Sequence, residues 1–319
     1  MAHPTTATPS PGEHSSGRAL AVPGAPRAAL PLASVGHLVP QGDFRARVHS
    51  VFARACNLQV GAELVAIGAS NGGDGPLHMR LSAGCSWDLR RLFGVGEPMA
   101  CRNGVLQSQR AQLVLRGVAV WRPGVPPPLL NAEVIADNAG RAAALLRQRR
   151  LAMQPERSGA DSRLLGTAGA GPEGATPALI DATRCLDAAS ALPALWRLVG
   201  WGEGLTPSGD DFIAGWLAAL QRLAGTNKAR QDFADAVSAA VEALAHRTTP
   251  IAAQMLRLAA RGEHGSLLLG GRDALLVEAD APRRDTAWQA LLALGAGSGA
   301  DLAEGLLAAT QAWTEAPAR

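Results

Sequence analysis

The sequence has few cysteines, and none of them is placed as metal sites or dense disulfide frameworks require. The 319 residues include four cysteines, Cys56, Cys85, Cys101 and Cys185, with no C-x-x-C pair. A disulfide scaffold needs denser spacing in a shorter chain, and a zinc knuckle needs paired ligands. The seven histidines form no H-E-x-x-H motif. We therefore expect reduced cysteines and no metal site built from cysteine and histidine.

Long apolar runs and a large net charge are also lacking. No segment approaches the roughly 18 consecutive apolar residues of a membrane helix. Lys and Arg number 30 against 27 Asp and Glu, a formal charge of only +3. This narrow excess, without aromatic residues among the basic ones, does not indicate nucleic-acid binding. The N-terminus lacks the basic segment and apolar core of a signal peptide. We expect a cytoplasmic protein that binds neither membrane nor nucleic acid.

The composition divides the first half of the chain into two parts. Residues 1–28 are rich in Pro, Ala, Ser and Thr and are predicted to form a disordered tail. Residues 29–153 are predicted to form a β-rich N-terminal domain, an antiparallel sheet or small barrel, because short runs of β-branched residues alternate with turn signals. An amphipathic helix from Asn131 to about Met153 is predicted to close this domain. The extended segments are expected at Arg47–Val60, Glu63–Gly68, Leu77–Leu81 and Gln112–Trp121.

The second half of the chain changes character. Residues 154–178 are rich in Gly and Pro but contain no G-x-x-x-x-G-K-[ST] phosphate loop, which favours a linker or lid. Residues 179–319 are rich in Ala and Leu and are predicted to form a helical domain. The expected helices span 179–199, 209–224, 229–246, 250–261, 284–294 and 300–314, with short extended pieces at Ser266–Leu269 and Ala274–Glu278. The predicted fold class is therefore α+β.

One stretch of the helical half carries the features of a ligand site. Residues 200–215 read GWGEGLTPSGDDFIAG. The alternate glycines allow positive φ angles and close approach of a ligand, and the loop runs directly into a predicted helix. The start of a helix offers unpaired N–H groups and the positive end of the helix dipole, which favours an anion. Asp210 and Asp211 would repel an anion there unless they bind a cation or transfer protons.

A purely structural interpretation explains the same residues. Ser208 and Asp211 have the spacing of a capping box, and Asp in a first helical turn is favourable without any function. On the motif alone, the capping and binding interpretations have about equal weight.

A second, similar helix start lies 90 residues further along. Residues 294–305 read LGAGSGADLAEG and repeat the pattern S-G-x-D-x-x-x-G. Ser298, Gly299 and Asp301 correspond to Ser208, Gly209 and Asp211, whereas Ala300 stands in the place of Asp210. The two helix starts could converge on one ligand, or they could be two ordinary caps.

A third motif, Arg247-Thr248-Thr249-Pro250, also has two readings. A threonine followed by Pro at the first helical position is a common helix start. Alternatively, Arg247 supplies a two-pronged donor for a carboxylate or phosphate.

Taken together, these motifs resemble a bacterial family long catalogued as a domain of unknown function. The resemblance covers roughly residues 35–315, and the GLTPSGDD run is its most specific part. One branch of the family is the allantoin-pathway subunit associated with oxamate carbamoyltransferase. The resemblance implies a subunit that takes part in the conversion of carbamoyl phosphate and oxamate to oxalurate and phosphate, or the reverse. It also implies partner subunits. The S-T-R-T-R motif of aspartate- and ornithine-type carbamoyltransferases is absent, so the reaction would use a different scaffold.

We therefore expect a site for a small anion, such as carbamoyl phosphate, at the helix starts. Asp210 and Asp211 are the candidate catalytic carboxylates; no cofactor is required, although Mg²⁺ could bridge them to a phosphate. Two alternatives are a non-catalytic subunit that binds a metabolite within a complex, and a hydrolase of amide or ureido bonds. The candidate ligand-binding residues are Gly204, Thr206, Ser208, Gly209, Arg247, Thr248, Ser298, Gly299 and Asp301.

Overall fold

The computed structural model describes residues 27–84, 87–153, 172 and 174–314, and every structural statement below refers to these residues. The predicted tail at residues 1–28 and the predicted linker at residues 154–178 lie largely outside this range. Among the described helices, none is long and apolar enough to cross a membrane.

The first part of the chain forms one curved sheet. Its strands follow the order β1-β9-β8-β7-β3-β4-β5-β6-β2-β10, with the two-residue strands β1 and β10 at the edges. Most neighbours are antiparallel, but β5 pairs with β6 in parallel, as do β1 with β9 and β10 with β2. The strands are β1 (Ala28–Ala29), β2 (Leu32–Gly36), β3 (Phe44–Val51), β4 (Ala55–Val60), β5 (Glu63–Gly68), β6 (His78–Leu81), β7 (Pro98–Arg102), β8 (Val105–Gln107), β9 (Ala111–Val114) and β10 (Val120–Trp121).

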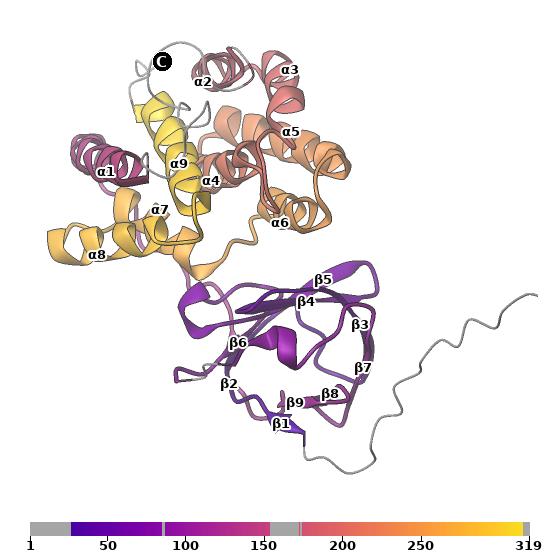
Figure 1. Ribbon diagram of the computed structural model, residues 1–319. Helices are drawn as coiled ribbons and strands as arrows, with labels where there is room; N and C mark the ends of the chain where they lie inside the picture. Colours follow the sequence, from indigo (N-terminus) through magenta and orange to yellow (C-terminus); the bar gives the residue numbers. More distant parts are fainter. Residues whose placement is uncertain (1–26, 85–86, 154–171, 173, 315–319) are drawn as a thin grey trace, which may run out of the picture.

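The sheet curls into a half-barrel around its own apolar core (Figure 1). Alternate residues of its strands, such as Val48, Leu58 and Met99, point into that core and are buried. The expected single segment Arg47–Val60 is a hairpin instead, because the chain turns at residues 52–54 between β3 and β4. The β-rich first part predicted from the sequence is confirmed.

Helices make up the rest of the described chain, which confirms the α+β class. They are α1 (Ala132–Met153), α2 (Ala175–Cys185), α3 (Ala188–Leu198), α4 (Ser208–Leu223), α5 (Lys228–Leu244), α6 (Pro250–Ala260), α7 (Ser266–Leu276), α8 (Ala281–Leu292) and α9 (Ser298–Thr314). The helix predicted at 179–199 is two helices, because Leu186 takes a left-handed conformation (φ 55°) and Asp187 caps a new helix start.

The extended pieces predicted at Ser266–Leu269 and Ala274–Glu278 are wrong, because residues 266–276 form the helix α7 and the next two residues leave it. Gly270 and Gly271 lower the helix propensity there and mislead a reading of the sequence. Gly271 packs closely on α8, since a methyl group on it would lie 2.4 Å from Leu291 Cδ2.

The helix α1 packs with the other helices and not with the sheet. Its buried residues, Ile135, Ala139, Ala142 and Leu146, belong to the helical core. In Figure 1, α1 lies beside α7, α8 and α9, away from the strands. The sequence interpretation that this helix closes the β-rich part is therefore wrong, because its apolar stripe matches a helical surface. The other expected domain boundaries stay predictions.

The helices α4 and α9 form the centre of the helical part. Both are buried almost all round, as expected for helices with apolar residues on every face. A methyl group on Gly215 would lie 2.0 Å from the carbonyl oxygen of Leu302, and one on Gly305 would lie 2.0 Å from that of Phe212. The glycines of the repeated motif thus allow the two helix backbones to touch.

We predict that Gly215→Ala lowers the free energy of unfolding by about 3 kcal/mol or more, because the new methyl group meets a backbone oxygen that cannot move aside. Gly270→Ala is the matched control: a methyl group there meets nothing within 4 Å. This second variant should be as stable as the parent or more stable by up to about 1 kcal/mol. Denaturant unfolding measures both. Equal stability of Gly215→Ala and the parent would contradict the close crossing.

Candidate functional site

The glycine-rich loop before α4 is held in a left-handed path. Gly200, Gly202 and Gly204 have φ angles of 78°, 107° and 95°. A side chain on Gly202 would also collide with the backbone, since its Cβ would lie 2.8 Å from the amide nitrogen of Ser208. Gly204 is exposed and meets nothing, so only its φ angle requires glycine. The loop therefore folds back against the start of α4.

The amide groups at the start of α4 are used largely within the protein. Gly209 N–H donates to the carbonyl oxygen of Trp201, while the N–H groups of Asp210 and Asp211 both donate to that of Pro207. The start of α9 repeats this arrangement: Gly299 N–H donates to Leu294, and those of Ala300 and Asp301 donate to Gly297. Few free backbone donors are thus left for an anion at either helix start.

The capping-box interpretation is not what the structure contains. The residue before the first turn of α4 is Pro207, and no side chain caps the helix. Ser208 begins α4 and Ser298 begins α9, as the repeat predicts. The two helix starts are neighbours, because Thr206 Oγ1 lies 2.9 Å from Ser298 Oγ. Whether they share a ligand stays a prediction.

Asp210 is a fully buried carboxylate with a partner on each oxygen. Its Oδ1 accepts a hydrogen bond from Gly200 N–H at 2.8 Å, and its Oδ2 accepts one from Thr248 Oγ1 at 2.5 Å. Burial raises the pKa of Asp210, and these two hydrogen bonds act in the opposite direction. Asp210 thus fastens both the glycine loop and the segment after α5 to the helix α4.

Arg247 lies on the outside of this assembly. Its guanidinium stacks 3.9 Å above the ring of Trp196 and donates to the carbonyl oxygen of that residue. Thr248 bonds Asp210. Thr249 caps α6, which confirms the helix start expected before Pro250, and it donates to the carbonyl oxygen of Leu205 at 2.6 Å. The Arg247-Thr248-Thr249 motif therefore braces the loop, and Arg247 remains exposed to solvent.

Asp211 differs from its neighbour in having an unsatisfied oxygen. The side chain is 1% exposed, and its Oδ2 has no hydrogen-bond partner in the described chain. Burial raises the pKa of Asp211 to about 8, the hydroxyls of Ser298 and Thr206 act to lower it, and the nearby Asp301 raises it. Asp211 is therefore mostly a neutral acid at neutral pH.

Two further carboxyl groups, those of Asp301 and Glu304, and the guanidinium of Arg150 complete a buried cluster. The sequence interpretation included Asp301 but missed Arg150 and Glu304. Arg150 Nη2 of α1 lies 2.5 Å from Asp301 Oδ1 and 3.0 Å from Glu304 Oε2. Burial raises the pKa of Glu304 to about 7 against the opposing charge of Arg150, and Asp301 raises it further. Burial alone would lower the pKa of Arg150, but Glu304 and Asp301 outweigh it and raise that pKa.

The signal for Arg150 was present in the sequence. A basic run at the end of a helix, such as Arg147-Gln148-Arg149-Arg150, usually faces solvent, whereas Arg150 lies four residues after Leu146 on the buried stripe of α1. A stripe at this spacing continues the same helix face. A cation on an apolar face indicates a buried carboxylate partner, because an unpaired buried charge is too costly.

A cavity of about 280 Å³ lies between the half-barrel and the helices, beside the cluster. Most of its wall is apolar, and its polar side chains include two carboxylates but no lysine or arginine. Thr206 is the one predicted site residue that lines it, and Ala214 and Leu302 of the central helix pair form the wall beyond. The polar side chains of the lining are Asn57, Asp74, His78, Thr206, Gln254, Glu263 and His264.

The two parts of the chain are joined around this cavity. Asp74 N–H donates to Ser266 Oγ, and Ser266 N–H donates to the carbonyl oxygen of Asp74, both at 2.8 Å. His264 of the lining is buried, and burial lowers its pKa to about 3. It is therefore a neutral imidazole, held 2.9 Å from Gln221 Oε1. Across the described residues, no group of three or more His, Cys, Asp or Glu side chains is arranged to hold a metal ion.

Comparison with known families agrees with this two-part structure. A profile described as the AllH family N-terminal domain matches residues 28–120, which are the half-barrel, and one described as oxamate carbamoyltransferase subunit AllH matches residues 198–310, which carry α4 to α9. No curated protein and no solved structure matches the chain. These matches place the chain in a class of proteins that is described as a carbamoyltransferase subunit. It belongs to the AllH family.

We predict that Asp211→Asn removes a pH dependence of stability. The pKa of Asp211 is higher in the folded protein than its ordinary value of 3.8. Its contribution is therefore complete below about pH 4 and is lost as the pH rises toward 8. Since Asn does not ionise, the melting temperature of Asp211→Asn minus that of the parent should increase from pH 5 to pH 8.

Asp187→Asn is the control for this experiment. Asp187 caps α3, and its hydrogen bonds with Ser190 lower its pKa. The difference in melting temperature for this variant should stay constant over the same range, because the group is ionised throughout. A difference for Asp211→Asn that is equally flat would refute the raised pKa.

A separate prediction concerns Asp210. Asp210→Ala should lower the free energy of unfolding by about 2–4 kcal/mol, because it leaves two buried donors without an acceptor. Asp210→Asn should cost less, since its amide can accept from Gly200 and donate to Thr248. Denaturant unfolding distinguishes the two variants. If Asp210→Ala is as stable as the parent, Asp210 does not hold the loop.

Proposed function

We propose that this chain is a subunit of an oxamate carbamoyltransferase and supplies a proton-transfer group for the exchange between oxalurate and oxamate. The observation that carries the proposal is the hydrogen-bonded connection from Thr206, in the wall of the cavity, through Ser298 to Asp211, whose pKa is about 8. Membership of the AllH family supports the reaction, and the connection supports this location within the chain.

The chemistry requires a proton at one defined atom. When phosphate attacks the ureido carbonyl of oxalurate, a C–O bond forms, the C–N bond breaks, and the departing amide nitrogen gains a proton. A carboxylic acid that is still protonated at neutral pH suits this step. In our proposal the Thr206 hydroxyl gives its proton to the nitrogen and takes one from the Ser298 hydroxyl, which in turn takes one from Asp211. In the reverse direction the same groups remove the proton from oxamate.

The cavity fits the amide or ureido part of a substrate better than its charged parts. Its wall combines apolar side chains with neutral donors and acceptors such as Gln254 and His264, which suit an uncharged ureido group. Asp74 and Glu263 also face it, and no lysine or arginine lines it, so carbamoyl phosphate is poorly matched to this cavity alone. We therefore propose that the cations that hold phosphate come from a partner subunit.

The alternative of a non-catalytic subunit that binds a metabolite is supported by a different observation. Both oxygens of Asp210 and the amides at both helix starts are engaged within the chain. These groups then shape the fold around the cavity and do not take part in the reaction. The two proposals predict different values of kcat when Thr206 loses its hydroxyl group.

We predict that Thr206→Val lowers kcat in the assembled complex by about 100-fold, within the usual contribution of a proton-transfer group. Thr206→Ser keeps the hydroxyl group and should retain most of the activity. Oxalurate should raise the melting temperature of the parent, with a stabilisation of about 2.7 kcal/mol at a hundred times its dissociation constant. Carbamoyl phosphate formation and thermal shifts provide the measurements.

The outcomes separate the two proposals. Unchanged kcat in Thr206→Val, together with a retained oxalurate shift, favours the non-catalytic subunit. If oxalurate, oxamate, phosphate and carbamoyl phosphate all leave the melting temperature unchanged, alone and in the complex, neither proposal stands.

A further inference from the structure

The outer face of the half-barrel carries an arginine-lined groove that the proposed function does not use. Side chains alternate along a strand between the two faces of the sheet. Ala46 and Met99 point into the core, so the residues next to them in sequence point outward. Arg45 pairs with Ala100, and Ala100 pairs with Gln107 on the next strand. Strand pairing therefore sets arginine and glutamine side chains from β4, β3, β7 and β8 on one outer face.

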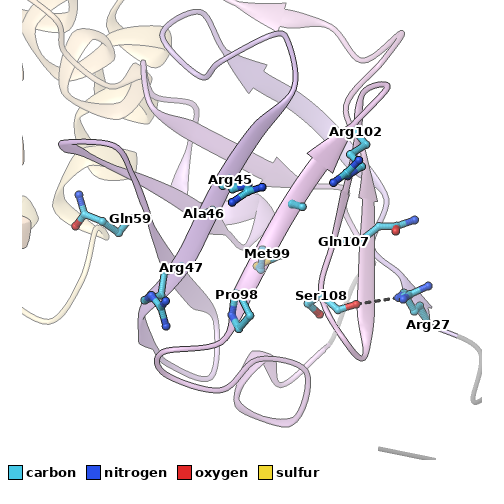
Figure 2. Close-up of a pocket in the computed structure, with 11 residues that line it drawn as sticks. Arg27, Arg45, Ala46, Arg47, Gln59, Pro98, Met99, Arg102, Gln107 and Ser108 are labelled. Atoms are coloured by element: carbon cyan, nitrogen blue, oxygen red, sulfur yellow. Dashed lines mark hydrogen bonds between the residues drawn. The ribbon is translucent and has the colours of Figure 1, made fainter. Parts of the chain in front are cut away.

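The hollow over these strands has a volume of about 670 Å³. Pro98 and Ala100 are among the lining residues, and long polar side chains stand around the hollow (Figure 2). No carboxylate is among the lining residues. The polar side chains of the lining are Arg27, Arg45, Arg47, Gln59, Arg102, Gln107 and Ser108.

The arginines of this groove are poorly neutralised. Arg27 Nε donates to the carbonyl oxygen of Ser108 and Arg47 Nη1 to that of Gly96, both at 2.8 Å. The side chains of Arg45 and Arg102 have neither a hydrogen bond nor an ion pair with the described part of the chain. Residues 1–26 contain a single acidic residue, Glu13, so that segment does not complement the groove in charge.

The spacing of the arginines indicates the shape of the occupant. Neighbouring strands lie about 4.8 Å apart, so the outer pair of these four strands is separated by roughly 14 Å. In Figure 2 the arginines stand around the hollow and do not point to one spot. One phosphate or carboxylate cannot reach all of them, whereas several carboxylates along an extended chain can. The lining contains no aromatic ring on which a nucleic-acid base could stack.

We propose that this groove binds an extended acidic segment of a partner protein, laid across strands β4, β3, β7 and β8. The guanidinium groups of the arginines form ion pairs with the carboxylates of the segment, and the side chains of Gln59 and Gln107 form hydrogen bonds with its backbone. This contact lies outside the cavity and needs no turnover, so its failure would leave the proposed proton transfer unaffected.

The test uses the full chain and a fluorescein-labelled octaglutamate peptide, followed by fluorescence anisotropy. Eight residues are enough, because an extended chain advances roughly 3.3 Å per residue. Arg45→Glu with Arg102→Glu should weaken binding at least about tenfold, because both charges are reversed. Arg45→Gln with Arg102→Gln should weaken it less, and this variant keeps the test valid if charge reversal impairs folding.

The matched control reverses Arg141 and Arg147, which are exposed on α1 and lie outside the groove. This double variant changes the net charge equally and should bind the peptide as the parent does. Four results would overturn the proposal: no saturable binding by the parent, an equal loss in the control, tighter binding of a single-stranded oligonucleotide of equal charge, or displacement of the peptide by low-millimolar inorganic phosphate.

Discussion

The backbone contact between α4 and α9 determines the geometry of the whole helical part. Gly215 meets Leu302 and Gly305 meets Phe212. With the 90-residue offset of the repeat, Phe212 corresponds to Leu302 and Gly215 to Gly305. The two contacts are thus the same contact made twice, with the roles of the helices exchanged. Such reciprocity relates the helices by an approximate two-fold axis and brings their first turns together.

This close crossing creates an electrostatic problem that the surrounding helices resolve. The first turn of α4 contains Asp210 and Asp211 and that of α9 contains Asp301, so bringing the two turns together buries Asp211 near Asp301. Like charges at short range in a dry interior are strongly unfavourable, and protonation or a cation relieves them. Arg150 neutralises the Asp301 side, and Asp211 retains a proton near neutral pH. The acid that we assign to proton transfer is thus a consequence of how the core is built.

Most of the fold could be predicted from the sequence, because its signals are local. The alternation of the strands and the helical periodicity of residues 132–153 and 208–314 each depend on a few neighbouring residues. The exceptions depend on distant partners. Gly271 marks a contact with α8, whereas glycine in isolation indicates an interruption. The apolar residues of α1 predict a buried face but not the element that covers it, because an apolar face packs equally well on a sheet or on helices.

The sequence indicated where the two helix starts lie, but not the roles of their residues or the partners Arg150 and Glu304. The repeat pointed to the adjacent helix starts, and Asp210 was recognised as the position without a counterpart. What distinguishes Asp210 from Asp211 is tertiary: one has donors on both oxygens, and the other has an oxygen without a partner. The spacing of the motif does not encode this difference in hydrogen-bond partners.

Side chains of opposite charge lie on different surfaces of the half-barrel, and this separation bears on how such a subunit works. Carboxylates face the cavity at the helical end, while arginines without acidic partners in the described chain occupy the outer face of the strands. A reaction that moves a phosphate needs cations near the transferring group. The arginine groove cannot provide them, because its wall shares no residue with that of the cavity. In our proposal, a second subunit therefore supplies the cations for the phosphate, and an acidic segment of such a subunit would find its complement on the outer face of the same chain.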